Sequence, residues 1–542
     1  MKTAAQIVDR WNELKGERAV WESTWDQVAR FVRPIRAEFL GLRTPGEKRN
    51  TQVFESTPLM AADNFAGGIY GMMTNPANRW FSLRLEDDDL NEYDPVMDWL
   101  YEVETRILNS FGPQSSRFYS VIPAYYADLA CFGTSVFYSE EGQRVGLIND
   151  NVRALSECCI AESAWGDVDT LYRRYNVTAR QAVQEFGTNL SSETQCRAEK
   201  SPNEKIAFIH CVEPNDGYEK GKLGPTGKPF VSIYVEEQTR KEVSRKGYDE
   251  LPYQAARWDQ AAGEVYGRGL GELILPDALT LTQMSRTSLI AAQKIADPPW
   301  AAPDEGVIKA ARTYPGGITY GAIDQQGNQL FRPLVSGARL DITHEMMEQR
   351  RNAIREGFYF SLMQMIGSPN MTATEWMGRQ EEKLRLMGKN LGRIQSEFLS
   401  PLIKRRFGLL SRTFRLPPPP PEIQGKPLNV EYVSPLARAQ MASEANAVVR
   451  SVQAIVPMAQ QDPGVWDNID TDEAVQAILR GYGAPAKMRR GADQVAELRD
   501  QRQQQVQTQQ MLAMAQAGAK AGRDAAGASK DFAQAQQTEG AA

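Results

Sequence analysis

The stretch 266–414 constrains the fold more than any other part of the sequence, because long helical patterns alternate there with strong helix breakers. A first helical pattern ends at the Asp-Pro-Pro-Trp motif of residues 297–300, since proline lacks the amide donor and biases the residue before it away from the helical region. Gly- and Pro-punctuated segments follow up to Leu340, and a second helical pattern covers 341–365. A Gly-Ser-Pro-Asn break separates it from a third pattern that starts at Thr372. The plan is helix, insertion, helix, loop, helix.

Apolar periodicity along the rest of the chain predicts a mostly helical α+β protein. Spacings of three and four residues predict helices at 4–33, 93–110, 116–132, 167–175, 178–187, 273–296, 341–365, 372–414, 435–456, 471–481 and 491–515. Alternating patterns predict strands at 80–83, 135–138, 144–149, 153–160, 205–213, 230–236, 239–246 and 430–433. Between the last helices, Pro457 and the Asp-Pro-Gly of 462–464 predict breaks, and the five prolines 417–421 predict a stiff extended connector.

Length and composition indicate a large soluble globular protein. The 542 residues, 42% of them hydrophobic and 24% charged, are enough for several domains. No run approaches the roughly eighteen apolar residues that a membrane helix needs. Asp9 interrupts the N-terminus where a secretory signal would require an apolar core. We therefore expect neither a membrane span nor export.

Residues that could carry chemistry are few and form no convincing catalytic constellation. His210 and His344 are the two histidines, and the His-Glu pair at 344–345 lacks the second histidine of a zinc-protease motif. Five cysteines without a Cys-x-x-Cys spacing indicate reduced thiols in a cytoplasmic setting. There is no Walker-type phosphate loop and no serine-hydrolase motif. We expect no catalytic residue, no metal site, no cofactor and no enzyme activity.

The glycines of the pattern Gly267-x-Gly269-x-Gly271 are the nearest approach to a nucleotide loop. Their spacing differs from the dinucleotide fingerprint, no strand–helix–strand context surrounds them, and Glu272 follows directly. We expect these glycines to let the chain enter a helix that packs closely against its neighbours.

The net charge of −6, from 62 basic and 68 acidic residues, argues against a protein that grips nucleic acid. Phosphate neutralisation by basic residues dominates the affinity of such proteins. The balance remains compatible with a protein that surrounds DNA without holding it.

Several long runs of the sequence carry a resemblance to a known family. The runs are KGERAVWESTWDQVARFVRP, NTQVFESTPLMAADNFAGGIYGMMTNPANRWFSL, YGRGLGE followed by LPDALTLTQMSRTSLIAAQKIADPPWAAPDEGV, and MTATEWMGRQEEKLRLMG. Together they resemble the head-to-tail connector (portal) proteins of short-tailed, T7-like podovirus bacteriophages. The resemblance is collinear over roughly residues 5–500.

The resemblance implies a portal fold with wing, stem, clip and crown, assembled as a ring around a central channel. By position it implies a wing at 1–265, a first stem helix at 266–298, a clip at 299–340, a second stem helix at 341–365, a channel loop at 366–371, a long wing helix with the Pro-rich connector and a strand at 372–434, a crown at 435–500 and a low-complexity tail or short barrel helix at 501–542.

The resemblance also implies two sets of site residues. The channel loop beside DNA would comprise Gly367, Ser368, Pro369, Asn370 and Met371. The clip that contacts terminase or adaptor would present Trp300, Asp304, Glu305, Tyr314, Tyr320 and Phe331.

The implied function is that of a portal at one capsid vertex of the virion, assembled in the host cytoplasm. Expected partners are further copies of the chain in a dodecamer, the terminase large subunit, a tail adaptor, the major capsid and scaffolding proteins, internal core proteins at the crown, and double-stranded DNA in the channel. Because a basic lining would stall DNA, we expect a predominantly negative channel with occasional Lys or Arg rings.

Three alternatives stay open from the sequence alone. One is another ring of the virion neck, such as an adaptor or tail-tube component, although the length and the two helices around an insertion disfavour it. The second is a DNA-processing enzyme such as a metal-dependent nuclease. The third is a soluble intracellular scaffold that forms no ring.

Overall fold

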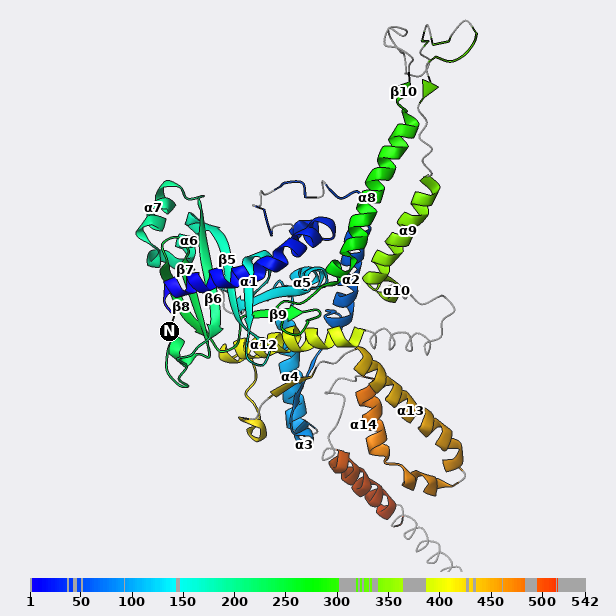
Figure 1. Cartoon of the computed structure of the whole chain (residues 1–542). Coiled ribbons are helices and arrows are strands. Elements are labelled where there is room, and N and C mark those ends of the chain that lie inside the picture. Colours follow the sequence, from blue (N-terminus) through cyan, green and yellow to red (C-terminus); the bar gives the residue numbers. More distant parts are fainter. Residues whose placement is uncertain are drawn as a thin grey trace, which may run out of the picture. The chain divides into compact units, whose positions relative to one another are not determined.

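The computed structural model in Figure 1 divides the chain into two units, and each is treated separately. Unit 1 comprises Met1–Arg84, Val103–Pro418 and Leu428–Ala439, and unit 2 comprises Leu85–Glu102, Pro419–Pro427 and Gln440–Ala542. The structure describes residues 2–36, 39–41, 46–49, 52–91, 93–142, 147–301, 318–319, 322–323, 326–330, 332–333, 340–363, 387–425, 428–431, 435–460, 462–482, 495–512 and 514.

Unit 1 opens with a long helix, α1 (Ala4–Phe31), which confirms the helix predicted at the N-terminus. Thr3 starts it with a capping box, because its hydroxyl accepts from the Gln6 amide while the Gln6 side chain accepts from the Thr3 amide. A short turn, η1 (Pro34–Arg36), follows where proline was expected to end the helix. Next come α2 (Thr57–Met73), α4 (Asp94–Ser110), whose first residues fall in unit 2, and α5 (Phe118–Phe132).

Unit 1 contains two larger antiparallel sheets. The smaller has the order β3-β2-β9, from β3 (Ile148–Arg153), β2 (Thr134–Glu141) and β9 (Tyr253–Arg257). The larger is a five-stranded meander of β4 (Cys158–Glu162), β5 (Val168–Thr178), β6 (Lys205–Pro214), β7 (Phe230–Glu236) and β8 (Lys241–Tyr248). A separate pair joins β1 (Ser82–Leu85) to β12 (Leu428–Glu431).

The predictions for this region differ from the structure in two places. The strand expected at 153–160 is divided, because β3 ends at Arg153, a short turn covers Leu155–Glu157 and β4 begins at Cys158. Residues 167–175 are expected as a helix, but 168–175 belong to strand β5, which pairs with β4 on one side and with β6 on the other. The helix predicted at 178–187 is confirmed as α6 (Ala179–Phe186), again with a capping box at Thr178. The sequence patterns missed α7 (Ser192–Lys200) and β9. Three short turns complete the region, η2 (Leu155–Glu157), η3 (Gly187–Asn189) and η4 (Pro225–Gly227).

The larger sheet buries both of its faces. One face packs against α1 through Ile7, Val8, Trp11 and Leu14 of the helix and Cys159, Tyr172, Ile209, Cys211, Val231, Ile233 and Val235 of the strands. The other face packs against the α6–α7 region through Ala179, Ala182, Leu190, Ile206, Phe208 and Val243. Because side chains alternate along a strand, Ile209 and Phe208 in β6 serve opposite faces. Figure 1 shows α1 crossing this sheet.

A hairpin of two long helices projects from unit 1. It consists of α8 (Leu270–Ala296) and α9 (Leu340–Gly357), and between them β10 (Trp300–Ala301) pairs with β11 (Arg332–Pro333). The helix predicted over 341–365 is interrupted at Phe358–Tyr359 and resumes as α10 (Phe360–Met363). Tyr359 has a φ of 53°, a left-handed conformation that stops the helix without glycine or proline.

The third helix of the organising stretch is described from residue 387 onward. A helical run at 387–394 passes through a π-helical turn, η5 (Gln395–Leu399), into α12 (Ser400–Arg412). Prolines 417–420 have no regular structure, as expected for an extended connector, and a short turn η6 (Pro421–Ile423) follows.

Unit 2 is helical among its described residues. It contains α3 (Asp88–Asn91), most of α13 (Pro435–Ala459), a short turn η7 (Pro463–Asn468), α14 (Thr471–Gly481) and a helical run at 495–512. Pro457, expected as a break, lies inside α13, two residues before its end. Arg499 of the last helical run forms an exposed ion pair with Asp472 of α14 at 2.6 Å. In the part of the chain that the structure describes, no helix has the length and apolar character to cross a bilayer.

Candidate functional site

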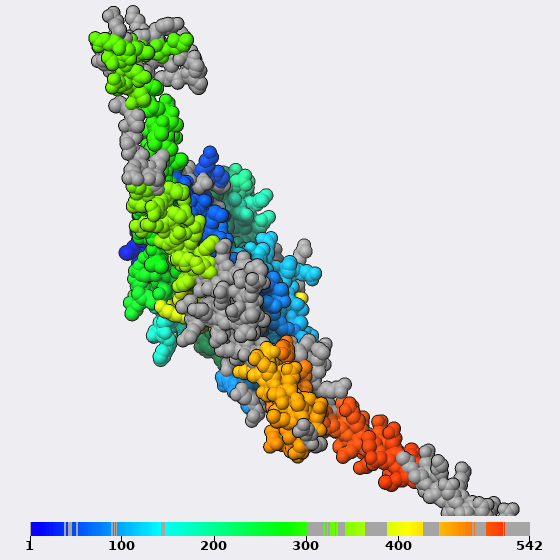
Figure 2. All heavy atoms as spheres, turned by 90° about the vertical axis from the view of Figure 1, so that its right-hand side faces the viewer, coloured from blue at the N-terminus to red at the C-terminus, as the bar shows by residue number. Residues whose placement is uncertain are grey.

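The candidate functional site is the stem hairpin, the name used below for α8 and α9 together. The two helices lie side by side in both views, with α9 in yellow-green beside α8 in green (Figures 1 and 2). They are antiparallel, because Gly357 at the end of α9 faces Ile274 near the start of α8, whereas Ser288 Oγ near the far end contacts Met347 Sδ at 3.7 Å. At Gly357 a Cβ would overlap the Ile274 side chain, so the absence of a side chain sets the interhelical spacing.

The outer part of the stem hairpin leaves large apolar side chains in solvent. Ser285 is the last buried residue of α8, and the eleven residues after it have no buried member. The exposed apolar side chains of the hairpin are Leu273 (68%), Leu289 (54%), Ile290 (43%) and Ile295 (49%) on α8, with Ile342 (45%) and Met346 (49%) on α9. Full burial of such a side chain stabilises a protein by about 1.5–3 kcal/mol. A contact that covered these side chains would therefore be strongly favourable.

The three arginines of α9 are engaged in ion pairs within the chain. Arg350 pairs with Asp277 at 2.7 Å, and Arg351 pairs with Glu55 at 2.7 Å. Arg355 pairs with Glu348, which also accepts from Arg351. Burial is the largest single influence on Glu55 and raises its pKa, but the hydrogen bonds from Arg351 and Thr57 together with the charge of Arg351 outweigh it and lower the pKa of that carboxyl. These guanidinium groups are therefore held by carboxylates of the same chain.

Glycines fix the root of the stem, as the sequence predicted. A Cβ on Gly269 would lie 2.5 Å from the Gly133 amide nitrogen and 2.6 Å from the Cys131 carbonyl oxygen. A Cβ on Gly271 would lie 2.5 Å from the same carbonyl oxygen, and one on Gly267 would overlap the Gly133 carbonyl. Gly133 itself has a φ of 75° and ends α5, which confirms its expected capping role. Backbone packs directly on backbone where α8 begins.

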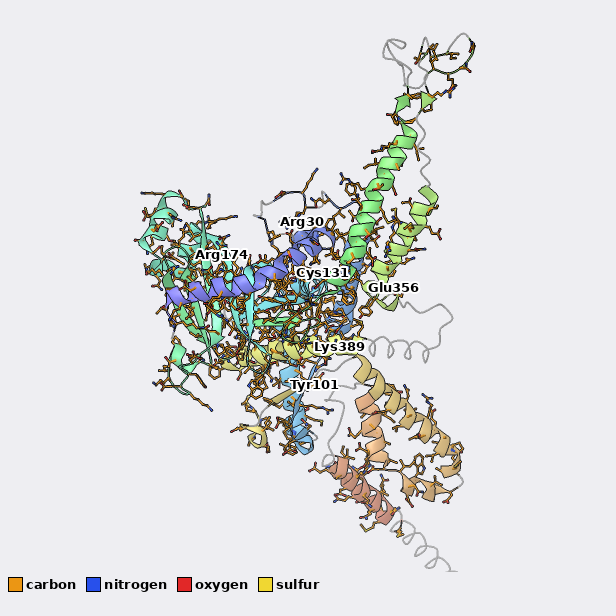
Figure 3. The ribbon with its side chains drawn as sticks, in the orientation of Figure 1. Arg30, Tyr101, Cys131, Arg174, Glu356 and Lys389 are labelled. Atoms are coloured by element: carbon orange, nitrogen blue, oxygen red, sulfur yellow. The ribbon has the colours of Figure 1, made fainter. Side chains whose placement is uncertain are left out.

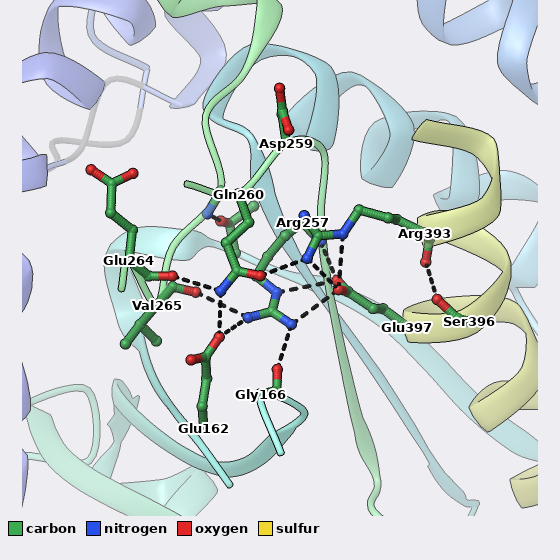
Figure 4. Close-up of polar contacts among 12 residues, drawn as sticks. Glu162, Gly166, Arg257, Asp259, Gln260, Glu264, Val265, Arg393, Ser396 and Glu397 are labelled. Atoms are coloured by element: carbon green, nitrogen blue, oxygen red, sulfur yellow. Dashed lines mark hydrogen bonds and ion pairs between the residues drawn. The ribbon is translucent and has the colours of Figure 1, made fainter. Parts of the chain in front are cut away.

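A second contact of the root is a buried polar network centred on Arg257 (Figure 4). Arg257 is 2% exposed, and its guanidinium pairs with Glu397 at 3.0 Å and with Glu162. Its Nη2 donates to the Gly166 carbonyl at 2.9 Å, and its backbone amide donates to Glu397 at 2.8 Å. Arg393 also bonds Glu397, at 3.0 Å. The network joins strand β9, the β4–β5 hairpin and the helix that enters α12.

The π-helical turn places Glu397 in this network. A wide turn inserts one residue into a helix and redirects the side chains around it, a feature often found at functional sites. Here Phe398 of the same turn stacks on Tyr125 at a centroid distance of 4.2 Å and packs edge-on against Phe137 at 5.3 Å. Glu397 and Phe398 thus fix this helix to β9 and to α5 simultaneously.

The predicted site residues lie mostly outside the described part of the chain. This holds for the whole channel loop, Gly367 to Met371, and for Asp304, Glu305, Tyr314, Tyr320 and Phe331 of the predicted clip. Trp300 is described, 40% exposed in strand β10, with Pro333 as its partner across the pair. The β10–β11 pairing therefore closes the base of the insertion directly above α8.

One of the two histidines is packed in the core and the other lies at the surface of a helix. His210 is buried, with Nδ1 2.7 Å from the Tyr253 hydroxyl, Nε2 2.9 Å from the Ser232 hydroxyl, and its ring stacked on Tyr234 at 3.9 Å. Burial holds the pKa of His210 well below its usual value, so the ring is neutral. His344 is exposed in the first turns of α9, as expected.

All five cysteines are free thiols, in agreement with the prediction. Cys131, labelled in Figure 3, lies in α5 beside the start of α8, and burial raises its pKa to about 12. A thiol with so high a pKa is a poor nucleophile. Within the described ranges, no group of three or more His, Cys, Asp or Glu side chains is arranged to hold a metal ion.

The Arg257 network could not be found from the sequence. Arg257 lies 95 residues from Glu162 and 140 residues from Glu397, and each arginine or glutamate follows an ordinary local pattern. The glycines of the stem root were the one local signal for this part of the site.

The fold and the site together define a structural protein with a projecting two-helix stem, and comparison with known proteins specifies the class. The chain belongs to the bacteriophage head to tail connecting protein family, whose model matches residues 4–489. It is 32% identical to the portal protein of Salmonella phage epsilon15 over 527 residues, which cover 95% of this chain and 94% of that relative. It is 31% identical to the probable portal protein of Bordetella phage BPP-1, over 95% of this chain and 93% of that relative.

A solved chain from the virion of a native gene transfer agent particle aligns with a TM-score of 0.31 at 10% identity, covering 81% of this chain and 95% of that chain. That similarity is too distant to bear on the fold.

These findings confirm the family resemblance and the α+β fold class. The chain functions as a phage portal protein and is a structural component of the virion, not an enzyme.

Proposed function

We propose that copies of this chain form a closed ring, a dodecamer by family analogy, at one capsid vertex, and that the axial channel serves genome packaging and ejection. The stem hairpins stand side by side around the channel, and the other parts keep the positions given by the resemblance, with the wing at 1–265, the clip at 299–340, the channel loop at 366–371, the wing helix, connector and strand at 372–434, the crown at 435–500 and the tail at 501–542.

The exposed apolar surface of the stem hairpin is the observation that carries this proposal. An amphipathic helix pair buries one apolar stripe between its two helices. In the outer part of the stem hairpin, past the level of Ser285, both helices also expose Leu, Ile or Met side chains to solvent. Exposed apolar patches of this kind mark protein–protein contacts. Copies related by rotation about an axis would cover each other's hairpins, and a heterologous contact that closes by rotation makes a ring.

The ion pairs of the stem support a channel through which DNA slides. Affinity for DNA rises with each phosphate that a free Lys or Arg neutralises. Arg350, Arg351 and Arg355 are instead paired with carboxylates of the same chain, so each presents a partly neutralised group. We expect a predominantly negative bore, and a continuous basic lining along the axis would refute this part of the proposal.

The partners follow from the same arrangement. The insertion at the tip of the stem hairpin would dock the terminase large subunit during packaging and the tail adaptor afterwards. The wing would contact the major capsid and scaffolding proteins, and the crown would contact internal core proteins. Assembly of the ring would take place in the host cytoplasm.

Electron microscopy of the purified full-length chain tests the ring directly. The wild type should show closed rings with an axial opening. Ile290→Glu, which puts a charge into the exposed apolar surface of α8, should shift the population towards single chains. Gln293→Glu is the matched control, because it adds the same charge at an exposed polar position of the same helix. A wild-type protein that stays monomeric without an axial opening would refute the proposed function.

A further inference from the structure

The stem hairpin has two lateral edges, one on each helix. Resting on the ring proposed above, we infer that the edges carry opposite charge and that the basic edge of one copy docks on the acidic edge of the next. The basic edge comprises Arg286 and Ile290 of α8, and the acidic edge comprises Ile342 and Glu345 of α9. The occupant of each edge is a second copy of this chain.

The outer halves of the two helices differ in charge along the sequence. Residues 278–296 of α8 contain two basic residues, Arg286 and Lys294, and no aspartate or glutamate. Residues 340–349 of α9 contain three acidic residues and no lysine or arginine. The α8 side of the outer hairpin is therefore basic, and the α9 side is acidic.

Both edges point away from the contact between the two helices of one chain. Ser288 Oγ contacts Met347 Sδ, so these residues mark the inner sides of α8 and α9. At 3.6 residues per turn, a side chain two positions away lies on nearly the opposite side of a helix. Arg286 and Ile290 are two residues before and after Ser288, and Glu345 is two residues before Met347. The charges of the two edges therefore do not meet within one hairpin.

The charged groups of the two edges have no ion-pair partner among the described residues. Arg286 contacts the Phe54 ring, whose centroid lies 5.8 Å from its Cζ atom. A cation–π contact at this distance orients the guanidinium without neutralising its charge. Glu345 is exposed, and the three arginines of α9 are held by other carboxylates. Within the described chain, each edge thus presents one uncompensated charge.

The two charges lie at the same height along the hairpin. Gly357 lies beside Ile274, so these two residues define a common level at the root. Arg286 and Glu345 are each twelve residues from that level, which places both at about 18 Å with a rise of 1.5 Å per residue. Rotation about an axis parallel to the hairpin leaves every height unchanged. In such a ring, Arg286 of one copy and Glu345 of the next meet at one level.

An apolar pair accompanies the charged pair. Ile290 and Ile342 are 43% and 45% exposed, and they lie farther from the root, at about 24 and 22 Å. Their burial beside the ion pair would exclude water from the contact, which strengthens the attraction between the charges. Because the two edges differ, the contact is heterologous, which is the type that closes into a ring by rotation.

Charge reversal in the full-length protein tests the inference. Arg286→Glu gives a chain whose two edges are both acidic, and Glu345→Arg gives one whose two edges are both basic. Each variant alone should need roughly tenfold more protein than the wild type for half-maximal ring assembly, because like charges then meet at every interface. Arg180→Glu is the matched control and should assemble as the wild type does, since it reverses an exposed arginine on α6.

An equimolar mixture of the two reversed variants separates contact between copies from contact within a chain. Where the variants alternate around the ring, an acidic edge meets a basic edge at every interface, so assembly should return close to the wild-type concentration. Alternation closes in a ring with an even number of subunits, as in the dodecamer proposed above. A charge pair that acted within one chain would not be rescued by mixing.

The neutral variants Arg286→Gln and Glu345→Gln provide a second readout without a reversed charge. Each should make ring assembly less dependent on salt concentration, because salt screens the pair that the substitution removes. The thermal midpoint of the single chain should be unchanged in all these variants, since both positions are exposed. Wild-type rings that tolerate both reversals, or a mixture that assembles no better than its components, would overturn the inference and leave the ring standing. Wild-type chains that form no ring would overturn the proposed function as well.

Discussion

The glycine root of the stem gives a prediction whose sign distinguishes close packing from simple helix propensity. Gly271 lies in the first turn of α8, where alanine would normally stabilise the helix by up to about 1 kcal/mol. A Cβ at this position would lie 2.5 Å from the Cys131 carbonyl oxygen, 2.8 Å from Val28 Cγ1 and 3.0 Å from the Cys131 Cα. Two of these three atoms belong to a backbone that no rotamer change can move.

The expected magnitude follows from these opposing effects. Overpacking in a tightly packed site costs about 1–3 kcal/mol, and overlap with backbone belongs at the upper end. After subtraction of the propensity gain, Gly271→Ala should destabilise unit 1 by about 2 kcal/mol. Gly16→Ala in the interior of α1 is the matched control, because no atom beyond the adjacent residues and the backbone of the same helical turns lies within 4 Å of the position that the new methyl group would take. This control should stabilise by about 1 kcal/mol.

Urea unfolding, followed at one fixed protein concentration below that of assembly, measures both changes. The midpoint should fall for Gly271→Ala and rise for Gly16→Ala, with unchanged slopes. If Gly271→Ala stabilised the protein as Gly16→Ala does, the direct backbone packing at the stem root would be wrong.

Three further predictions concern other parts of the chain. Arg257→Met should cost about 3 kcal/mol in urea unfolding, because the partly buried carboxylates of Glu162 and Glu397 lose the buried guanidinium that pairs with both. Arg174→Met, which breaks the half-exposed pair of Arg174 (labelled in Figure 3) with Glu237, should cost less than about 1 kcal/mol, and equal costs would contradict the network's role. Because the pKa of His210 is depressed in the fold, the unfolded chain binds the extra proton, so stability should fall below about pH 6.5 by up to about 1.4 kcal/mol per pH unit. His210→Gln should remove that part of the slope between pH 7 and pH 5, and an unchanged slope would show that His210 is not its source. Deletion of 367–371 should spare ring assembly but impair retention of packaged DNA, and normal retention in a packaging assay would exclude a channel-loop role.

The sequence predicted those elements whose signals are local. The prolines at 298–299 follow the end of α8 at Ala296, and the glycines before α8 pack as their spacing indicated. These features depend on backbone chemistry within a few residues, so a single sequence shows them.

The elements that were missed depend on distant partners. Leu171 and Tyr172 are adjacent apolar residues that suit a helical face, yet pairing with β4 and β6 on both sides makes β5 a strand. The end of α9 has no glycine or proline at the left-handed position, and Phe358 and Tyr359 instead pack on Phe65 of α2. The network around Arg257 likewise joins residues far apart in the chain. The periodicity of apolar residues cannot reveal contacts between distant parts of the chain. The channel loop and most of the clip lie outside the described residues, so their assignments stay predictions.

The stem root also determines how the protein bears force. An axial push on the tip of the hairpin travels down α8 and meets main chain against main chain at Gly133 and Gly269, a junction with no side chain that could rotate and yield. The other leg ends at the left-handed Tyr359, where the ladder of helical hydrogen bonds is interrupted. The first leg is thus anchored by backbone packing and the second contains a joint, so mechanical load on the tip should bend the hairpin towards α9 and spare the attachment of α8.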